Sequence, residues 1–387
     1  MKYLTWIIVL VVVIWGGWAL LSKDNVPAVD ASPIKLGFMG PLTGDLANMG
    51  ANAKAAVEIA VEELNSSGGI NGRNIEVIFE DDQCEGASAA SAISKLTTTD
   101  KVSAVVGPTC SGATLGAAPV AEAAKTVLLA FCATADTVSA AGDYIFRDVP
   151  KDSFQAKFAA DYLYSTGKRK AAILYVNNDW GVGLDKAFAE SFKALGGSIV
   201  ADESYAPDSK DLRTQLTKIK SSGADVLYFA GFPDGTIAAL KQAKELGVKA
   251  LLFGADAWDD TRVWTEAGTA GEGAMYTVAG TNSSEDFKAK MKAKLGSDDV
   301  IYCSNYAYDA VKVLAQVMAK VGTDSTMIKD ELYKTTYTGG VASASISFDQ
   351  NGDPTTANYV IKVVKDGKAD VVGAEPAPTD VVPAPVQ

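Results

Sequence analysis

The chain has 387 residues, of which 48% are hydrophobic and 21% charged, with a formal net charge of −12 and an isoelectric point near 4.7. This length is enough for two ordinary domains, and so acidic a chain argues against nucleic-acid binding, which needs a basic surface. The chain contains no histidine, which excludes Ser-His-Asp and Cys-His nucleophile activation and removes the commonest ligand of catalytic zinc.

An apolar segment comes first in the chain. Lys2 precedes LTWIIVLVVVIWGGWALL at 4–21, and about 18 residues at ~1.5 Å each span roughly 27 Å, close to a bilayer core. We favour residues 1–22 as an uncleaved N-terminal anchor helix. A cleaved signal peptide remains the alternative, because only passable small-residue cleavage sites follow the apolar core. In either case Lys2 orients the segment so that the folded part is extracytoplasmic.

Alternating strands and helices follow a polar tether at 23–32. Each strand has a short apolar run that ends in Gly, Pro or small polar residues, which is typical of buried parallel strands joined by helices. The strands expected in this first array are 34–39, 75–79, 102–106, 127–130 and 144–147, and the helices are 48–64, 87–96 and one that begins near 112.

The same alternation restarts at Phe154. The expected helices are 154–165, 184–195, 211–221, 235–246, 284–295, 303–320 and 326–334, and the strands are 171–176, 198–201, 226–229, 250–253, 275–278, 342–348 and 359–364. Two such arrays predict two open, mostly parallel α/β sheets with helices on both faces, whose ligand crevice lies at the carboxyl ends of the strands. A Pro-rich tail at 374–387 is expected to be disordered.

The stretch VSAVVGPTCSGAT at 102–114 joins one such strand to a helix. Ser111 is placed as the helix N-cap, where unpaired N–H groups, the macrodipole and a hydroxyl together favour a carboxylate or phosphate. Taken alone, the same stretch also fits an ordinary strand-to-helix turn.

Five short motifs in order make the sequence recognisable: DDQC at 81–84, GPTCSGA at 107–113, FCATA at 131–135, NNDWG at 177–181 and GFPDG at 231–235. From about 33 to 373 the chain resembles the branched-chain amino-acid-binding proteins, the Leu/Ile/Val-type solute-binding subunits of ABC transporters with the type I periplasmic-binding-protein fold. The resemblance implies two lobes that close on a ligand. Lobe 1 would comprise 33–148 plus 280–347 and lobe 2 149–279 plus 348–373, with crossings near 147–151, 278–281 and 347–350.

The resemblance also implies a ligand set. The α-carboxylate of a bound amino acid would contact the Ser111 hydroxyl and N–H and the Thr134 N–H. Its ammonium would contact the Cys132 carbonyl, the Thr134 hydroxyl and Asp256. The acid is needed because a desolvated ammonium requires a charged partner. The candidate ligand-binding residues are Met49, Cys110, Ser111, Cys132, Ala133, Thr134, Trp180, Phe232 and Asp256. Trp180 and Phe232 replace tyrosines usual in well-known members, Asp256 replaces a glutamate, Cys132 an alanine and Met49 a tyrosine.

The resemblance pairs Cys84 with Cys110 in a disulfide that fixes the loop bearing Ser111. Cys132 and Cys303 are expected to be separate buried thiols, with a second bridge as the alternative. The adjacent acids Asp81 and Asp82 lack further ligands for a metal ion, and no metal or cofactor is expected.

These inferences predict an extracytoplasmic, monomeric protein that captures an α-amino acid, aliphatic or branched-chain, and delivers it to an ABC permease. One alternative is a membrane-tethered sensory module of the same fold, and another is a binder of a related amide or small organic acid. An enzyme with a Cys132 nucleophile is disfavoured because no histidine base exists.

Overall fold

The structure is a computed structural model that describes residues 32–297 and 300–372. The expected anchor at 1–22 and the tail at 374–387 lie outside these residues, as does nearly all of the tether. Among the described helices, none combines the length and the apolar character that crossing a lipid bilayer requires. The described residues from Ile34 onward form one compact unit.

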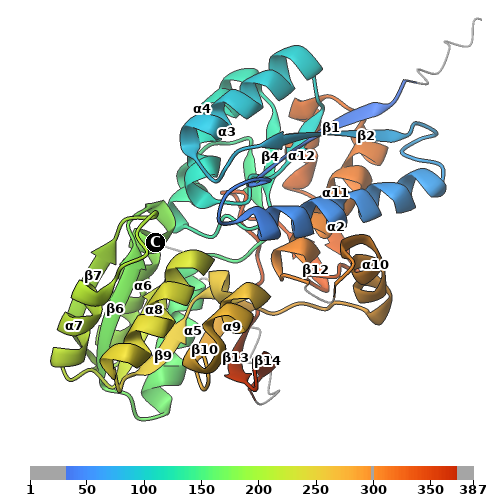
Figure 1. The fold of residues 1–387 in the computed structure, drawn as a ribbon. Coiled ribbons are helices and arrows are strands. Elements are labelled where there is room, and N and C mark those ends of the chain that lie inside the picture. Colours follow the sequence, from blue (N-terminus) through green and yellow to red (C-terminus); the bar gives the residue numbers. More distant parts are fainter. Residues whose placement is uncertain (1–31, 298–299, 373–387) are drawn as a thin grey trace, which may run out of the picture. The chain divides into compact units, whose positions relative to one another are not determined.

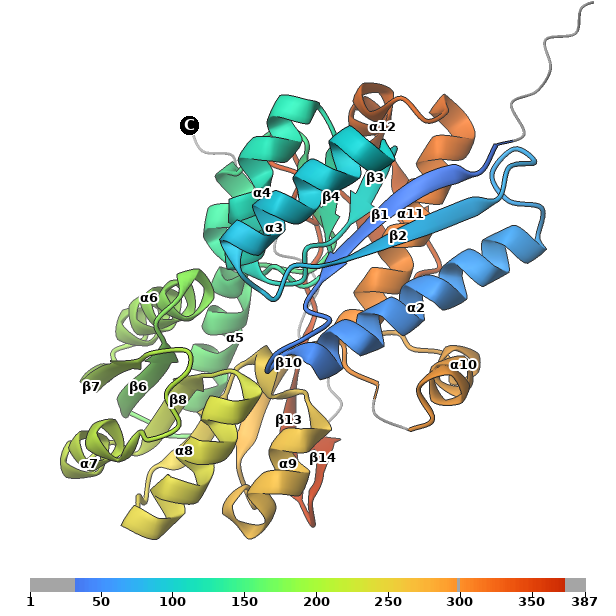
Figure 2. The same cartoon turned by 45° about the horizontal axis from the view of Figure 1, so that its top comes forward.

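The first sheet has five parallel strands in the order β2-β1-β3-β4-β5. Helices α3 and α4 pack against each other on one face, and α2, α11 and α12 cover the other (Figure 1, Figure 2). The strands are β1 Ile34–Gly40, β2 Ile75–Asp81, β3 Ala104–Val106, β4 Val127–Ala130 and β5 Ile145–Arg147. The helices are α2 Ala47–Ser66, α3 Gly86–Lys95, α4 Ser111–Ala124, α10 Glu285–Leu295, α11 Cys303–Val321 and α12 Ser325–Leu332.

The second sheet has seven strands in the order β14-β13-β10-β9-β8-β6-β7. Strands β6 to β10 run parallel, whereas β13 pairs antiparallel with both β10 and β14. The strands are β6 Lys170–Val176, β7 Ser198–Tyr205, β8 Val226–Ala230, β9 Leu251–Gly254, β10 Met275–Ala279, β13 Tyr359–Lys365 and β14 Lys368–Val371. The helices are α5 Asp152–Ser165, α6 Asp179–Ala194, α7 Arg213–Ser221, α8 Pro233–Leu246 and α9 Thr261–Ala267.

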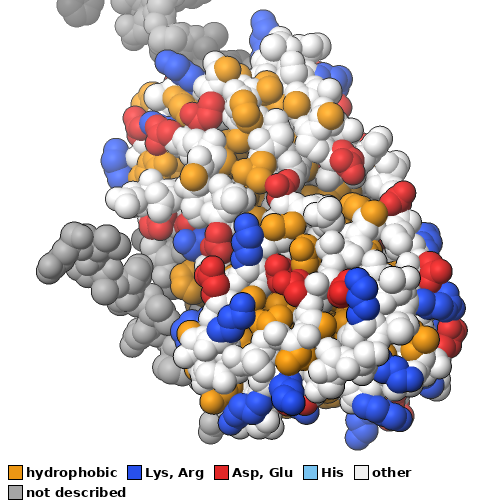
Figure 3. All heavy atoms as spheres, turned by 90° about the vertical axis from the view of Figure 1, so that its left-hand side faces the viewer, with side chains coloured by type: hydrophobic (Ala, Val, Ile, Leu, Met, Phe, Trp, Pro, Cys, Tyr) orange, Lys and Arg blue, Asp and Glu red, His pale blue; other side chains and the backbone are white. Residues whose placement is uncertain are grey.

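The central strands explain why these arrays fold as they do. All residues of β4 and β8 are buried, as expected for parallel strands covered by helices on both faces. The prediction of two mostly parallel α/β sheets is therefore confirmed. On the face drawn in Figure 3, Lys and Arg side chains are interspersed with Asp and Glu, so this face carries no extended patch of one sign.

The chain passes between the two sheets three times: from β5 to α5, after β10, and between the small β11–β12 hairpin and β13. The hairpin strands are β11 Thr336–Thr338 and β12 Ser345–Ser347. We call the two halves lobe 1 and lobe 2, as in the predicted division; its residue bounds stay a prediction.

Several local predictions were wrong. Helix α6 begins at Asp179 rather than 184 because the Asn178 side chain accepts from the Gly181 N–H over 2.9 Å, which caps the helix one turn earlier. Cys110, not Ser111, is the N-cap of α4, and it makes no side-chain capping bond. The strand expected at 342–348 shrinks to β12, and α9, β11 and β14 were missed.

Candidate functional site

The start of α4 lies at the carboxyl ends of β3 and β4. Gly107 has a φ of +114°, and a Cβ there would come within 2.1 Å of the Met39 carbonyl oxygen, so the turn that leads to α4 requires glycine. Ser111 is 3% exposed, and its hydroxyl accepts from the Ala135 N–H over 3.1 Å. This bond joins the start of α4 to the loop after β4, so the two segments expected to bind a carboxylate are held together.

Asp256 provides the acidic side of the site. It lies just after β9, is 4% exposed, and accepts from the Ala257 N–H over 3.0 Å. Its Oδ2 accepts from the Tyr302 hydroxyl over 2.5 Å. Burial raises the pKa of Asp256 to about 6, although the bond from Tyr302 opposes the rise. A cation placed beside this carboxylate would offset the cost of its burial.

A second buried acid lies close to Asp256. Asp152 begins α5, is fully buried, and its N–H donates to the Thr134 carbonyl over 2.8 Å. Burial raises the pKa of Asp152 well above its ordinary value, and the Asp256 charge raises it further. Two buried carboxyl groups thus lie close together, and burial favours the neutral form of both. A nearby cation would favour their charged forms instead.

Two aromatic side chains of lobe 2 form an apolar wall. Trp180, in the first turn of α6, stacks on Phe232, the N-cap of α8, with ring centroids 5.2 Å apart and an interplanar angle of 6°. Such a stacked pair excludes water from the polar groups beneath it, which strengthens their interactions.

These groups meet at one cavity of about 40 Å³ between the two lobes. Its lining is Leu46, Met49, Thr109, Cys110, Ser111, Cys132, Trp180, Phe232, Asp256, Ala257 and Tyr302. The cavity is far smaller than the roughly 300–1,000 Å³ of pockets that hold drug-sized ligands. Its walls must therefore move before even a small organic ligand can enter.

Seven of the nine candidate residues line this cavity. The other two, Ala133 and Thr134, are buried in the loop after β4 without lining it. Sequence reasoning missed Leu46, Thr109, Ala257 and Tyr302. Thr109 lies within the quoted GPTCSGA motif and Ala257 follows Asp256, so their positions carried a signal. Tyr302 precedes α11, and nothing local in the sequence places it opposite Asp256.

Polar contacts between side chains and backbone groups also connect the two lobes outside the cavity lining. The Arg262 Nη2 donates to the Asp45 carbonyl over 2.7 Å and lies 3.2 Å from its carboxylate, and the Asp234 N–H faces the same carboxylate at 3.2 Å. Burial and the neighbouring Asp234 raise the pKa of Asp45 to about 6. Asn48 donates to Asp260 over 3.2 Å. These contacts hold the lobes in a closed arrangement.

The structure contains two disulfides. Cys84 is bonded to Cys110, as the resemblance implied, and this bridge anchors the residue before Ser111. Cys132 is bonded to Cys303, so the expectation of separate thiols was wrong. The two residues are 171 positions apart in sequence, but the loop after β4 and the start of α11 meet beside the cavity, with their Cα atoms 5.6 Å apart.

The acids Asp81 and Asp82 have structural roles. Asp81 accepts from the Leu42 and Gln83 N–H groups and from the Thr43 hydroxyl, and Asp82 accepts from the Cys84 N–H. Across the described residues, no group of three His, Cys, Asp or Glu side chains is arranged to hold a metal ion.

Comparison with known proteins gives consistent matches. The family described as "Periplasmic binding protein" matches residues 33–368. The Leu/Ile/Val-binding protein BraC3 of Rhizobium johnstonii is 30% identical, over 88% of this chain and 94% of its own. The Leu/Ile/Val-binding protein homolog 3 of Brucella melitensis is 29% identical, over 88% and 94%.

A solved structure is similar over the same region. The branched-chain amino acid transporter substrate binding protein LivJ from Streptococcus pneumoniae, in complex with isoleucine, has a TM-score of 0.80 and 31% identity. The match covers 88% of this chain and 99% of that one.

Proposed function

The chain belongs to the periplasmic binding protein family and has its two-sheet α/β fold, and from this premise we propose that it captures an α-amino acid between its lobes and delivers it to an ABC permease. The relatives named for leucine, isoleucine and valine support a branched-chain aliphatic ligand. The family consists of solute-binding proteins, and the role proposed here requires no chemical step.

One observation carries this proposal: a single cavity is lined both by the start of a helix, at Ser111, and by a buried acid, Asp256. The helix start favours a carboxylate because its first N–H groups lack intrahelical partners and the macrodipole is positive there. The buried acid favours an ammonium. An α-amino acid carries both groups on one carbon, so it can satisfy both ends of a small cavity at once.

The apolar lining supports an aliphatic side chain. Leu46, Met49, Trp180 and Phe232 line the cavity with largely apolar side chains and offer no charged partner to a polar ligand side chain. Burying a leucine-sized side chain among them contributes about 1.5–3 kcal/mol.

Closure of the lobes follows from differential binding. Ser111 belongs to lobe 1, whereas Asp256, Trp180 and Phe232 belong to lobe 2, so a ligand that contacts all of them binds the closed form more tightly than the open form. The closed form would then present the surface that the permease recognises.

As a member of this family the chain is extracytoplasmic, where disulfides persist. We propose further that residues 1–22 anchor it to the membrane uncleaved and that it acts as a monomer. Intact mass measurement of the protein extracted from membranes tests the first point, because cleavage would remove the mass of the segment. Sedimentation tests the second.

Titration calorimetry with the full-length chain tests the ligand. We expect heat of binding with leucine, isoleucine or valine and none with benzoate, which has a carboxylate but no amine for Asp256. Absence of binding to every α-amino acid would overturn the proposal. Tight benzoate binding together with weak leucine binding would instead support the organic-acid alternative.

A further inference from the structure

We propose that Tyr302 determines ligand specificity at the amine end of the site, by orienting the Asp256 carboxylate and by closing the cavity behind it so that only an unsubstituted primary ammonium fits. This inference rests on the proposed binding of an α-amino acid.

The first basis is a hydrogen bond between the lobes. Tyr302 precedes α11 of lobe 1, and its hydroxyl donates to Oδ2 of Asp256 in lobe 2 over 2.5 Å. The other carboxylate oxygen accepts from the Ala257 N–H. The two donors fix the plane of the carboxylate, so its remaining lone pairs have set directions for an incoming ammonium.

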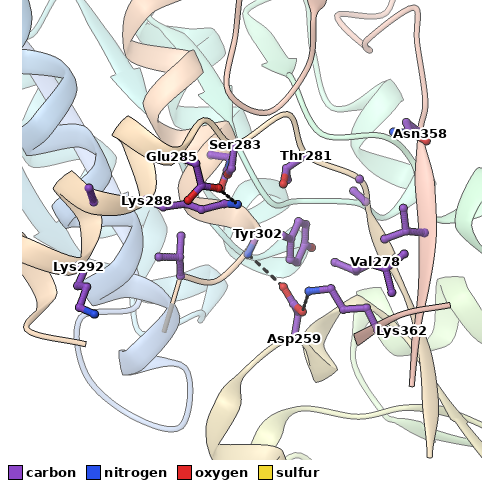
Figure 4. Close-up of a pocket in the computed structure, with 17 residues that line it drawn as sticks. Asp259, Val278, Thr281, Ser283, Glu285, Lys288, Lys292, Tyr302, Asn358 and Lys362 are labelled. Carbon is purple, nitrogen blue, oxygen red and sulfur yellow. Dashed lines mark hydrogen bonds and ion pairs between the residues drawn. The ribbon is translucent and has the colours of Figure 1, made fainter. Parts of the chain in front are cut away.

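The second basis is the position of Tyr302 between two cavities. A larger pocket of about 620 Å³ lies beside the segments that cross between the lobes, and among the residues lining the two cavities Tyr302 is the one they share. Figure 4 shows the Tyr302 ring among the residues of this hinge pocket, with Thr281 and Asn358 on the crossing segments and Lys288 on α10 around it. The side chain therefore separates the ligand cavity from the hinge pocket.

Tyr302 is held firmly enough to act as a partition. Its N–H donates to Oδ2 of Asp259 over 3.3 Å, and Asp259 also pairs with Lys362. The next residue, Cys303, is disulfide-bonded to Cys132, and the Tyr306 ring meets the Tyr302 ring edge-on at 6.1 Å. Tyr302 as a whole is 5% exposed, so its side chain cannot move aside without disturbing several contacts.

This arrangement restricts the substituents that an amine can carry. An ammonium bonded to Asp256 lies beside the Tyr302 hydroxyl, where an N-methyl group would meet the tyrosine side chain and would remove an N–H that the buried site can use. Sites built to bond a ligand N–H reject analogues that lack it. Shortening Tyr302 would join the two cavities and give an N-substituent room.

Calorimetry with full-length variants tests whether Tyr302 excludes N-substituted amines, with L-leucine and N-methyl-L-leucine as probes. We expect the wild-type protein to bind leucine at least about 100-fold more tightly than its N-methyl derivative. Tyr302→Ala should reduce the ratio of the two affinities to about tenfold or less. Tyr302→Leu, which also shortens the side chain, should reduce this ratio as well. Tyr306→Phe is the matched control, because it keeps the ring that contacts Tyr302 and alters a buried tyrosine of α11 that lines neither cavity.

A pH profile with Tyr302→Phe tests the orienting role separately, since this variant keeps the ring. The ionisable groups close to Asp256 are Asp152 of α5, Tyr228 of β8, Tyr359 of β13 and Tyr302 itself. The three tyrosines have raised pKa values and stay neutral between pH 5 and 8. Loss of the Tyr302 donor raises the pKa of Asp256, so the pH below which leucine affinity falls should move upward by at least about half a pH unit.

Each outcome decides a different point. If the wild-type protein binds no α-amino acid, the proposed function fails and this inference fails with it. If leucine binds but the Tyr302→Ala and Tyr302→Leu variants prefer leucine over N-methyl-leucine as strongly as the wild type does, Tyr302 does not exclude N-substituted amines. The proposed function would still stand. An unchanged pH profile in Tyr302→Phe overturns the orienting role.

Discussion

The Nε of Arg147 donates to Oδ1 of Asp353 over 2.7 Å, and the two side chains are 1% and 3% exposed. Arg147 ends β5 at the first crossing between the lobes, and Asp353 lies on the third. The Nη1 of Arg147 also donates to the carbonyls of Ala133 and Ala135, over 3.0 and 2.8 Å. One buried ion pair thus ties two crossings to the loop that helps to form the ligand site.

Asp353→Asn should destabilise the protein strongly, because it leaves the buried Arg147 charge without its ionised partner. Breaking a buried pair in this way costs about 3–5 kcal/mol. Urea unfolding of wild type and variant measures the difference. Asp161→Asn is the control, since its pair with Lys157 is exposed and should be worth under about 1 kcal/mol. A loss of less than about 1 kcal/mol in Asp353→Asn would mean that the pair does not hold the crossings.

Ser111→Ala should weaken amino-acid binding by about 1–3 kcal/mol, because the ligand carboxylate loses a donor in a buried site. It also removes the acceptor of the Ala135 N–H, so a smaller loss of stability should accompany it. Calorimetry and thermal unfolding measure the two effects. Ser91→Ala, an exposed serine of α3, should change neither. Unchanged affinity in Ser111→Ala would exclude its hydroxyl from the ligand site.

Asp256→Asn should change affinity and stability in opposite directions. A carboxyl whose pKa is raised on folding costs stability above its unfolded pKa of about 3.9, and this cost is complete above pH 6. The neutral asparagine removes the cost, so at pH 7 the ligand-free variant should be at least as stable as the wild type. Its affinity for leucine should fall at least about 30-fold, because the ammonium loses its charged partner.

The wild-type pH profile gives a further check on this residue. Leucine affinity should decline as the pH falls below about 6, where Asp256 is protonated, and in Asp256→Asn this decline should be shallower. Calorimetry between pH 5 and 8 measures both proteins. The buried acids Asp45 and Asp152 also have raised pKa values and are present in both proteins, so the difference between the two profiles is what reports on Asp256. A wild-type affinity that stays constant down to pH 5 would contradict the assignment of Asp256 as the ammonium partner.

The sequence was informative where a signal was local. Buried strands such as β4 are short apolar runs that end in turn residues, so their positions were predictable, and the motif containing Ser111 identified one side of the site. The helix predicted at 184–195 leaves out Trp180, because α6 begins earlier, at Asp179, where the Asn178 side chain caps it. Tyr302 could not be found in this way, because its proposed role depends on a contact with Asp256 of the other lobe, 46 positions away in the sequence.

Arg262→Gln should weaken ligand binding although Arg262 does not line the ligand cavity. Arg262 of α9 in lobe 2 bonds to Asp45 of lobe 1, and this contact favours the closed form. Arg262 is partly exposed, so the expected loss is about 1 kcal/mol, or roughly fivefold in affinity. Calorimetry measures the affinity, and small-angle scattering should show a larger radius of gyration in the ligand-free variant. Arg213→Gln, which removes an exposed arginine within lobe 2, should alter neither quantity.

Cys303→Ser tests the disulfide to Cys132, which sequence analysis gave only as the alternative to separate thiols. Removing the bridge to Cys132 frees a long loop in the unfolded chain and should lower the free energy of unfolding by about 2–5 kcal/mol. It should also loosen Tyr302 and so weaken leucine binding. In the denatured, unreduced wild type, iodoacetamide should label no cysteine, whereas in Cys303→Ser it should label Cys132. Labelling of both Cys132 and Cys303 in the wild type would mean that the two thiols are not bonded.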